Sequence, residues 1–436
     1  MKPEKTETKT IAVKGSILHF IDNPAIVGEE KSHQFFDNGL MVIENGQIKE
    51  IGEAADLEKN LDKNTQRIDY SGKLILPGFI DTHIHYPQTD VIASYGKQLL
   101  DWLSDYTFPK EGQFSDPEYA NEVADFFLAE LLRNGTTTAQ MMCTVHQQSA
   151  DIIFEKSDQK NLRMIAGKMM MDREAPDFLL DNPQSSFDES LELAEKWHGK
   201  NRLLYAVTPR FALTSTPEQL KKTQELLEKD NSLYFHTHLS ENSDEIAMVA
   251  KLFPEAKNYL DVYDQFGLIN EKSTFAHSIH LSDGEYELLG KSNAAVSFCP
   301  SSNLFIGSGL FDLNKMEQSG IKVGIGSDVG GGTSFSMLKT LADAYKVLQL
   351  KGQNLTALHA FYLATLGGAK SLQLESKIGN FLPGKEADFI VINSESTPLI
   401  QRRMKYTETL AERLFVLMML GDDRSIEATH ILGEKV

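Results

Sequence analysis

A run of apolar residues between Leu74 and Gln88, LILPGFIDTHIHYPQ, ends in an Asp and two histidines that can ionise or bind metals. In an extended strand, residues two apart point to the same side, so Asp81, His83 and His85 share one face. Two imidazoles on one face can hold one cation. They could equally be two satisfied core histidines, so the rest of the chain must decide between a metal site and a packed core.

Three later apolar runs end in side chains of the same chemical kinds. His238 ends LYFHTHLS, His277 ends STFAHS and Asp328 ends KVGIGSD. The carboxyl ends of barrel strands converge on one face, where active sites of that fold lie, so we expect these side chains to meet His83 and His85. Imidazole nitrogens with one carboxylate suit zinc or iron and not magnesium. Five such residues at equivalent positions argue against a purely structural role for all of them.

Two polar residues flank His238. Glu241 lies three residues beyond it in HLSE, near enough to move protons without occupying the metal, as a general acid/base must. The alternative is an ordinary Glu in the first turn of a helix, which the helix dipole favours. The neighbouring metal ligand favours catalysis. His236, two residues before His238, is interpreted as a structural residue or as a support behind the metal ligands.

The middle of the chain alternates short apolar strands with longer amphipathic stretches over roughly 300 residues, about the size of one barrel with insertions. Strand-like runs such as LLYAVTP and AAVSFCP are separated by helix-like runs such as PEQLKKTQELLEKD. This rhythm favours an α/β fold with one (β/α)8 TIM-type barrel over two doubly wound domains. We expect the barrel to span residues 76–377.

Both ends of the chain carry β-rich patterns of another kind. Near the N-terminus, GLMVIENGQIKEIG places Asn45-Gly46 between alternating apolar residues, which predicts a hairpin. Near the C-terminus, GKEADFIVIN and ATHILGEKV alternate in the same way. Because chain ends commonly meet, we expect residues 1–75 and 378–436 to form one small β-sandwich domain.

Composition limits the class of protein. With 436 residues and a formal net charge of -19, the chain can bury a large core but would be repelled by nucleic acid and by an anionic membrane surface. Cys143 and Cys299 are too few for a disulfide framework, which fits a reducing compartment. The first ten residues, MKPEKTETKT, lack the apolar core of a signal peptide, and no segment resembles a membrane span. We therefore expect a cytoplasmic enzyme or scaffold.

The motifs PGFIDTHIH, HLSE, FAHS and GIGSD, in this order, resemble the amidohydrolase superfamily. The narrower motifs LLDWLSDYTFP, VTPRFALT and SMLKT resemble the guanine deaminases within it, whereas NGTTTA and ATLGG are generic to the superfamily. The resemblance implies a metal-bearing barrel beside a β-sandwich made from both chain ends. It also implies hydrolysis of guanine in purine catabolism, one zinc per chain with iron as the alternative, and a homodimer.

The resemblance also assigns roles by matching position. The catalytic residues correspond to Glu241, Asp328 and His277, and the substrate-binding residues to Gln88, Arg210 and Phe211. The metal ligands correspond to His83, His85, His238, His277 and Asp328. One departure is that a Tyr expected shortly after His277 is His280 here, which puts only local packing in doubt.

The chemistry of the proposed substrate site agrees with this resemblance. Arg210 can donate two hydrogen bonds to the O6 and N7 acceptors of guanine, and adenine offers no O6. Gln88 can both donate and accept, which suits the mixed edge of a purine, although a loop-surface amide is the plain alternative. Phe211 and Trp102 could pack on the purine face, but aromatic residues are often core residues, so the role of Trp102 stays open.

The same residues argue against several other functions. Another mononuclear aminohydrolase or chlorohydrolase, acting on a different purine or a triazine, is disfavoured by TPRF and Gln88. A binuclear amide hydrolase would need a carboxylated lysine, for which Lys168 is the only candidate and a structural role fits better. Zinc deaminases with HxE and PCxxC motifs are excluded because Cys299-Pro300 lacks the second Cys. A catalytically inactive scaffold would be expected to have lost ligands, and none is missing.

Overall fold

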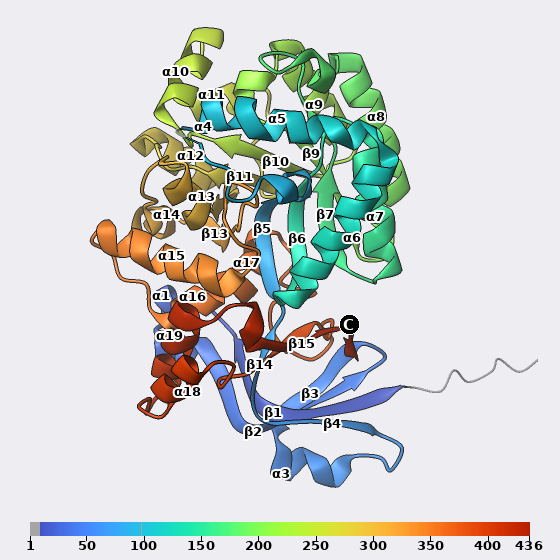
Figure 1. Ribbon diagram of the computed structural model, residues 1–436, viewed down its shortest axis with the longest axis vertical. Coiled ribbons are helices and arrows are strands. Elements are labelled where there is room, and N and C mark those ends of the chain that lie inside the picture. The colour runs from blue at the N-terminus through green and yellow to red at the C-terminus, as the bar shows by residue number, and fades with distance from the viewer. Residues whose placement is uncertain (1–8, 97) are drawn as a thin grey trace, which may run out of the picture.

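The computed structural model describes residues 9–96 and 98–436, which form a large barrel above a smaller β domain (Figure 1). Most of the N-terminal MKPEKTETKT segment, which carried the expectation about a signal peptide, lies outside the described residues. No helix within the described ranges combines the length and the apolar character that a bilayer span requires.

Eight parallel strands of the described chain follow one another around the barrel, with a two-residue strand β8 (Met169–Met170) paired to the side of β9. The eight are β5 (Phe79–His85), β6 (Thr136–Met142), β7 (Arg163–Gly167), β9 (Leu203–Pro209), β10 (Tyr234–Leu239), β11 (Ser273–His277), β12 (Ala295–Phe298) and β13 (Lys322–Ile325). The predicted (β/α)8 barrel is therefore confirmed.

The first and last barrel strands meet through the chain that follows β13. Asp328 N donates to His83 O over 2.9 Å, and His85 N donates to Val329 O over 3.0 Å. These two bonds close the barrel at its carboxyl end. They also place the HxH motif directly beside Asp328.

Asp81, which shares the inward face of β5 with the two histidines, ties the same seam. It is fully buried, and its carboxylate accepts from Ser327 N over 3.0 Å, from Ser327 Oγ over 2.5 Å and from His83 N over 3.2 Å. Burial raises the pKa of Asp81 to about 7, and these hydrogen bonds oppose the rise. The Asp that ends the apolar run thus joins two strands.

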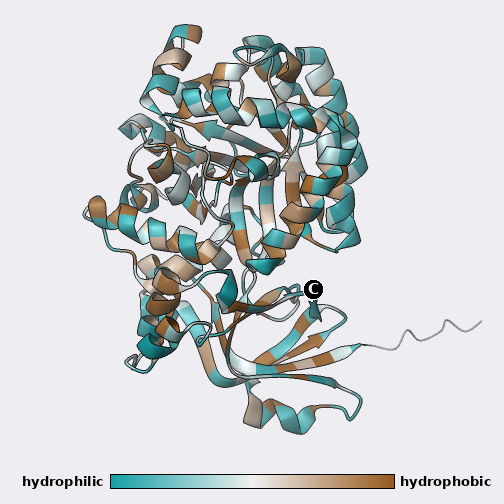
Figure 2. Ribbon diagram, in the orientation of Figure 1, coloured by the Kyte–Doolittle hydropathy of each residue, from teal (hydrophilic) through white to brown (hydrophobic). Residues whose placement is uncertain are grey.

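Helices between the strands cover the outside of the barrel, and they carry alternating polar and apolar stretches (Figure 2). In α9, Thr216 caps the first turn by accepting from Gln219 N, Pro217 occupies the first helical position, and Leu220 and Leu226 are buried. The longer covering helices are α6 (Pro117–Arg133), α7 (Gln147–Gln159), α8 (Pro183–Trp197), α9 (Pro217–Lys229), α10 (Ser243–Leu252), α12 (Asp283–Ser292) and α15 (Met337–Leu350).

Shorter elements complete the barrel and its rim. An insertion between β5 and α6 contains η2 (Tyr86–Val91), α4 (Leu99–Trp102), the π-helical turn η3 (Leu103–Thr107), α5 (Phe108–Glu111) and η4 (Gly112–Ser115). Further short helices of the barrel are η5 (Asp177–Leu179), η6 (Ala212–Thr214), α11 (Tyr259–Asp264), α13 (Pro300–Phe305), α14 (Leu313–Gln318), α16 (Ala357–Tyr362), η7 (Leu363–Gly367) and α17 (Gly368–Ser371). Those near the two chain ends are α1 (Pro24–Val27), α2 (Glu29–Ser32), α3 (Ala54–Leu57), η1 (Glu58–Asn60) and η8 (Asp423–Ser425). In the C-terminal segment, α18 (Pro398–Met404) precedes α19 (Leu410–Leu420), which packs against α15 and α16.

The small domain is built from both chain ends, as expected. Its strands are β1 (Thr10–Phe20), β2 (His33–Glu44), β3 (Gln47–Glu53), β4 (Gln66–Pro77), β14 (Phe389–Ile392), β15 (Ile426–Ile431) and β16 (Glu434–Lys435). They pair in the order β16-β15-β14-β4-β1-β2-β3, antiparallel except for the parallel pair of β1 with β4. The sheet is strongly curled. Ile48 in the edge strand β3 donates its N–H to the carbonyl of Lys385, just before β14, over 2.7 Å, and the two halves of the sheet enclose an apolar core.

The predicted hairpin lies between β2 and β3. Asn45 and Gly46 both take positive φ angles, 52° and 80°, between the paired residues Glu44 and Gln47. These angles are those of the turn that suits the twist of a two-residue hairpin. The expected domain limits at residues 75/76 and 377/378 stay a prediction, while β4 runs to Pro77 and β5 starts at Phe79.

Charged side chains join the small domain to the amino ends of the barrel strands. Glu386 accepts from Arg163 Nε over 2.7 Å and from Arg202 NH2 over 2.6 Å, and Asp388 also pairs with Arg202. The two arginines are buried. Buried charges must be paired, so this network makes the position of the small domain depend on the barrel.

We expect Glu386→Ala to lower the free energy of unfolding by about 3 kcal/mol, because it leaves the buried Arg163 without its carboxylate. The urea midpoint of the purified variant measures this loss. Lys49→Ala, which removes the exposed Lys49–Glu44 pair, serves as the control and should cost less than about 1 kcal/mol. A Glu386→Ala midpoint equal to that of the control would contradict a stabilising role for the network.

Candidate active site

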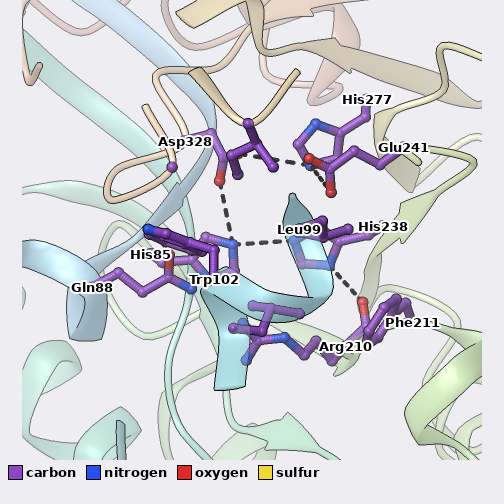
Figure 3. Close-up of a pocket in the computed structure, with 13 residues that line it drawn as sticks. His85, Gln88, Leu99, Trp102, Arg210, Phe211, His238, Glu241, His277 and Asp328 are labelled. Atoms are coloured by element: carbon purple, nitrogen blue, oxygen red, sulfur yellow. Dashed lines mark hydrogen bonds and ion pairs between the residues drawn. The ribbon is translucent and has the colours of Figure 1, made fainter. Parts of the chain in front are cut away.

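The five side chains predicted to bind a metal meet at the carboxyl end of the barrel. Figure 3 shows four of them, His85, His238, His277 and Asp328. His85 Nε2 lies 3.1 Å from His238 Nε2, and His83 offers a ring nitrogen within 4.8 Å of both. Asp328 Oδ1 lies 3.1 Å from His83 Nε2 and 3.4 Å from His85 Nε2. His277 Nε2 lies 3.7 Å from Asp328 Oδ2. The barrel therefore brings all five together.

These separations are those of atoms that share one ion. Donors held about 2.0–2.2 Å from a zinc ion in a tetrahedron lie about 3.3 Å apart. The Nε2 atoms of His83 and His277 are buried and make no hydrogen bond to any described residue, although a carboxylate oxygen lies near each. Buried polar atoms are seldom left without a partner, so these residues fit a divalent metal.

Two of the rings are held in the tautomer that metal binding needs. His238 Nδ1 lies 2.6 Å from the carbonyl oxygen of Arg210, and His277 Nδ1 lies 2.9 Å from Asn303 Oδ1. Both oxygens only accept, so each Nδ1 donates a proton to its oxygen and the Nε2 of each ring is the nitrogen left for the cluster. Such outer contacts fix the orientation of a metal-binding imidazole.

His236 supports a third ring from below. Its Nε2 lies 2.8 Å from His83 Nδ1. Burial lowers the pKa of His236 well below its usual value, so the ring is neutral and can accept the proton of His83 Nδ1. This contact agrees with the interpretation of His236 as a support behind the ligands.

Glu241 faces the same cluster from the loop after β10. Its Oε2 lies 3.5 Å from His277 Nε2, and its Oε1 accepts from Ser308 Oγ over 3.2 Å. Burial raises the pKa of Glu241 to about 7, and the charge of His277 opposes the rise. A carboxyl group with a pKa close to the working pH can both hold and release a proton, which is what a general acid/base needs.

Asp328 is set apart from Glu241 by its neighbours. Burial acts to raise the pKa of Asp328, but the adjacent His83 and His277 outweigh it and lower that pKa below its usual value. Asp328 is therefore the ionised carboxylate of the pair at neutral pH. Two carboxyl groups with separated pKa values can take the roles of base and acid.

Backbone strain collects around these residues. Ser240, His277, Ser278 and Asp328 all take positive φ angles, between 48° and 67°. This left-handed conformation costs a non-glycine residue about 1–2 kcal/mol, and such outliers cluster at functional sites. These residues lie at or just after the ends of β10, β11 and β13.

The predicted substrate-binding side chains lie beside the metal cluster. Gln88, Arg210, Phe211 and Trp102 are among the residues that line a cavity, together with Asp328 (Figure 3). Trp102 is buried, and its indole N–H donates to Ser94 O over 3.1 Å. Trp102 therefore forms part of the cavity wall, and the hydrogen bond to Ser94 holds its indole ring in place. Apolar walls with a few converging polar groups are the usual lining of a small-molecule site.

Sequence reasoning missed a buried carboxylate behind this wall. Arg210 NH1 donates to both oxygens of Glu111, over 3.0 and 2.8 Å, and Gln88 Nε2 donates to Glu111 Oε1 over 3.1 Å. The segment DYTFPKE gives no sign that its Glu is buried. The available signal was indirect: an arginine inside a cavity needs a counter-charge. Asn303 and Ser308 were missed as well, because no motif marks them.

Three residues considered from the sequence take defined places. His280 Nε2 lies 2.8 Å from Ser308 O and so holds the loop that carries Ser308. Lys168 is fully buried and pairs with Asp181 over 2.5 Å and with Glu189 over 3.2 Å, which agrees with a structural lysine. Cys299 was not expected at the site, yet its sulfur lies within 4.8 Å of potential ligand atoms of His83, His277 and Asp328.

We expect His85→Ala to lose most of the bound metal, because it removes one of the converging donors. Metal content after dialysis, measured by mass spectrometry, should fall from about one ion per chain by tenfold or more. His198→Ala is the matched control, since His198 bonds Tyr205 N and Ser232 Oγ outside the site. If both variants kept the same metal content, His85 would not be a ligand.

Comparisons with known proteins place the chain close to the guanine deaminases of the amidohydrolase family. The sequence profile described as Amidohydrolase family matches residues 74–436. The guanine deaminase of Escherichia coli strain K12 is 52% identical, over 98% of this chain and 97% of that protein. A solved structure of E. coli guanine deaminase superimposes with a TM-score of 0.95 at 52% identity, covering 98% of this chain and 99% of the other. Guanine deaminase from C. acetobutylicum, solved with guanine in its active site, gives 0.88 at 29% identity, covering 98% and 100%.

Proposed function

This chain belongs to the amidohydrolase family, and we propose that it hydrolyses guanine to xanthine and ammonia as a metal-dependent deaminase. The observation that carries this function is one cavity lined by Arg210 and Gln88, by the imidazoles of His85, His238 and His277, and by the carboxyl groups of Asp328 and Glu241. The identity with the E. coli guanine deaminase over nearly the whole chain supports the same substrate. The reaction removes a purine amino group and so belongs to purine catabolism.

The purine is read by hydrogen bonds from the cavity wall. Arg210 donates from NH1 to Glu111, and its other guanidinium nitrogens donate to no other residue of the described chain. They can donate to O6 and N7 of guanine. Gln88 offers its remaining N–H and a lone pair to the same edge, and Phe211 provides an apolar wall. Adenine would leave a buried donor unpaired.

The metal would be held by His83, His85, His238, His277 and Asp328. We propose zinc, one ion per chain, because zinc prefers nitrogen and oxygen donors in this number, and iron is the alternative for the same donor set. When bound, such an ion supplies a water whose pKa is lowered toward about 7, so that hydroxide is available near neutral pH.

The protein's own groups then move the protons. Asp328, which is ionised, orients the attacking water and accepts its proton. Glu241 holds a proton near neutral pH and delivers it to a ring nitrogen as the oxygen adds to C2. The proton taken up by Asp328 then passes to the amino group, the C2–N bond breaks to release ammonia, and the added hydroxyl gives its proton back to Glu241 to leave xanthine. His277 lies between Glu241 and Asp328 and keeps them oriented.

The thiols and the surface of the protein bear on its location and assembly. We propose that the protein works in the cytoplasm, which its two buried free thiols, Cys143 and Cys299, support. We also propose a homodimer. Large exposed apolar side chains in the C-terminal segment, such as Leu399 in α18 and Tyr406 in the turn after it, support an interface between copies.

We expect the metal-replete protein to convert guanine to xanthine in an ultraviolet assay, with adenine at least about 10²-fold poorer in kcat/KM. The reason is that a site built to bond O6 rejects a purine that leaves its donors unpaired. A panel of purines and triazines in the same assay checks the substrate. Deamination of another heterocycle with guanine left unchanged would reassign the substrate within the family.

We expect Glu241→Gln to keep the fold and the metal but to lose about 10²- to 10⁴-fold in kcat, because an amide cannot transfer the proton. In the unsubstituted enzyme, a pKa raised to about 7 keeps Glu241 protonated below neutral pH, so kcat should decline as the pH rises above about 7. The rate of ammonia release, followed in timed samples between pH 5 and 9, measures both the loss of kcat in the variant and the pH dependence of kcat in the unsubstituted enzyme. Near-normal turnover by Glu241→Gln would remove its assigned role.

We expect Arg210→Leu to lose about 10²-fold or more in guanine kcat/KM, because a charge-assisted contact to the base is removed. The substitution leaves the Arg210 carbonyl that orients His238, so the metal content should not change. Kinetics, metal content and melting temperature are measured on one preparation. A less stable variant with normal kinetics would instead make Arg210 a structural residue.

A further inference from the structure

A single carboxylate stands behind the purine-reading wall of the cavity. Glu111, the last residue of α5, is fully buried and does not line the cavity that the structure describes. Its Oε2 accepts from Arg210 NH1 over 2.8 Å, and its Oε1 accepts from the same nitrogen over 3.0 Å. The carboxylate thus holds the guanidinium from the side away from the substrate.

The same carboxylate also sets the direction of the second reader. Glu111 Oε1 accepts from Gln88 Nε2 over 3.1 Å, while Gln88 Oε1 accepts from Gly330 N over 3.2 Å. These two contacts fix which end of the amide is the donor. One N–H and one lone pair of Gln88 are left for a ligand. Without Glu111, the amide could turn over and present the opposite pattern to the purine.

Burial makes this arrangement a strong constraint. Arg210 is nearly fully buried, and a guanidinium in such a place needs a counter-charge. Phe108, one turn before Glu111 on α5, lies beneath the guanidinium with its ring centre 5.3 Å from the guanidinium carbon. A planar guanidinium held at one nitrogen and over one face has little freedom left, so its other donors point in one direction.

We propose that Glu111 is a positioning residue for guanine recognition, which acts through both Arg210 and Gln88 and touches no reacting atom. This inference rests on the proposed function, since it concerns how the same cavity reads its base. Glu111 joins the loop after β5, the insertion that carries α5, and the loop after β9. The substrate edge is thereby oriented before the purine arrives, which lowers the cost of binding it in the reactive pose.

The central test is a double-mutant cycle on guanine kcat/KM. Glu111→Gln keeps the shape but places an N–H donor against the donors of Arg210 and Gln88, and it should lose about 10²-fold. Arg210→Leu should lose a similar factor, and the double variant should lose less than about threefold more than the worse single variant. Residues that act as one unit show this non-additivity, whereas independent losses would multiply to about 10⁴-fold.

Glu386→Gln is the matched control, because Glu386 is also a largely buried glutamate that pairs with arginines, but at the opposite end of the barrel. It should lower the melting temperature with less than about twofold change in kcat and KM. Glu111→Gln should instead change kcat/KM at unchanged metal content. Glu111→Asp, which keeps the charge but withdraws the carboxylate, gives an intermediate loss and replaces Glu111→Gln in the cycle if that variant does not fold.

The outcomes separate the inference from the proposed function. Activity of the unsubstituted enzyme and of Glu386→Gln on guanine, with additive losses in the cycle, would overturn the role of Glu111 alone. Normal kinetics of folded Glu111→Gln, or a loss of stability without a kinetic effect, would do the same. If the unsubstituted enzyme left guanine unchanged, the proposed function would fail first, and the positioning role with it.

Discussion

Closure of the barrel between its first and last strands is the constraint on which the site depends. His83 and His85 come from β5, and Asp328 follows β13, so these groups are neighbours only because the seam is closed. Asp81 ties the seam by accepting three hydrogen bonds, two of them from Ser327. The metal cluster is therefore a consequence of global closure, and its geometry is as rigid as the barrel.

Arg210 links the metal cluster to the substrate cavity. Its carbonyl oxygen fixes the proton of His238, while its guanidinium lies in the cavity wall against Glu111. A shift of this one residue would move His238, a predicted metal ligand, and the guanidinium in the cavity wall together. Reaction requires that the attacking oxygen, the proton donor and the purine stay aligned within fractions of an ångström, and a shared residue holds that alignment.

The sequence predicted what is written in local patterns and missed what depends on distant contacts. The HxH pair, the ligands at strand ends and the Asn45-Gly46 hairpin follow from periodicity and turn chemistry, and the barrel and the fused small domain follow from their rhythm. Glu111 meets Arg210 across 99 positions, and Asn303 meets His277 across 26. No pattern within α5 or α13 marks these side chains, because their partners are set by how the loops fold over the barrel. The individual roles assigned to the site residues stay predictions.

The candidate site lies at the carboxyl end of the barrel, whereas the buried ion pairs that stabilise the fold lie at its amino end. At the carboxyl end, His277 and Asp328 hold a left-handed backbone, and the Nε2 atoms of His83 and His277 lack a hydrogen-bond partner among the described residues. At the amino end, Glu386 pairs with Arg163 and Arg202 and joins the small domain to the strands. Strain at one end persists only when the rest of the structure over-determines it. The small domain, which contributes no side chain to the cavity in the described residues, helps supply that constraint by fixing the strands from below.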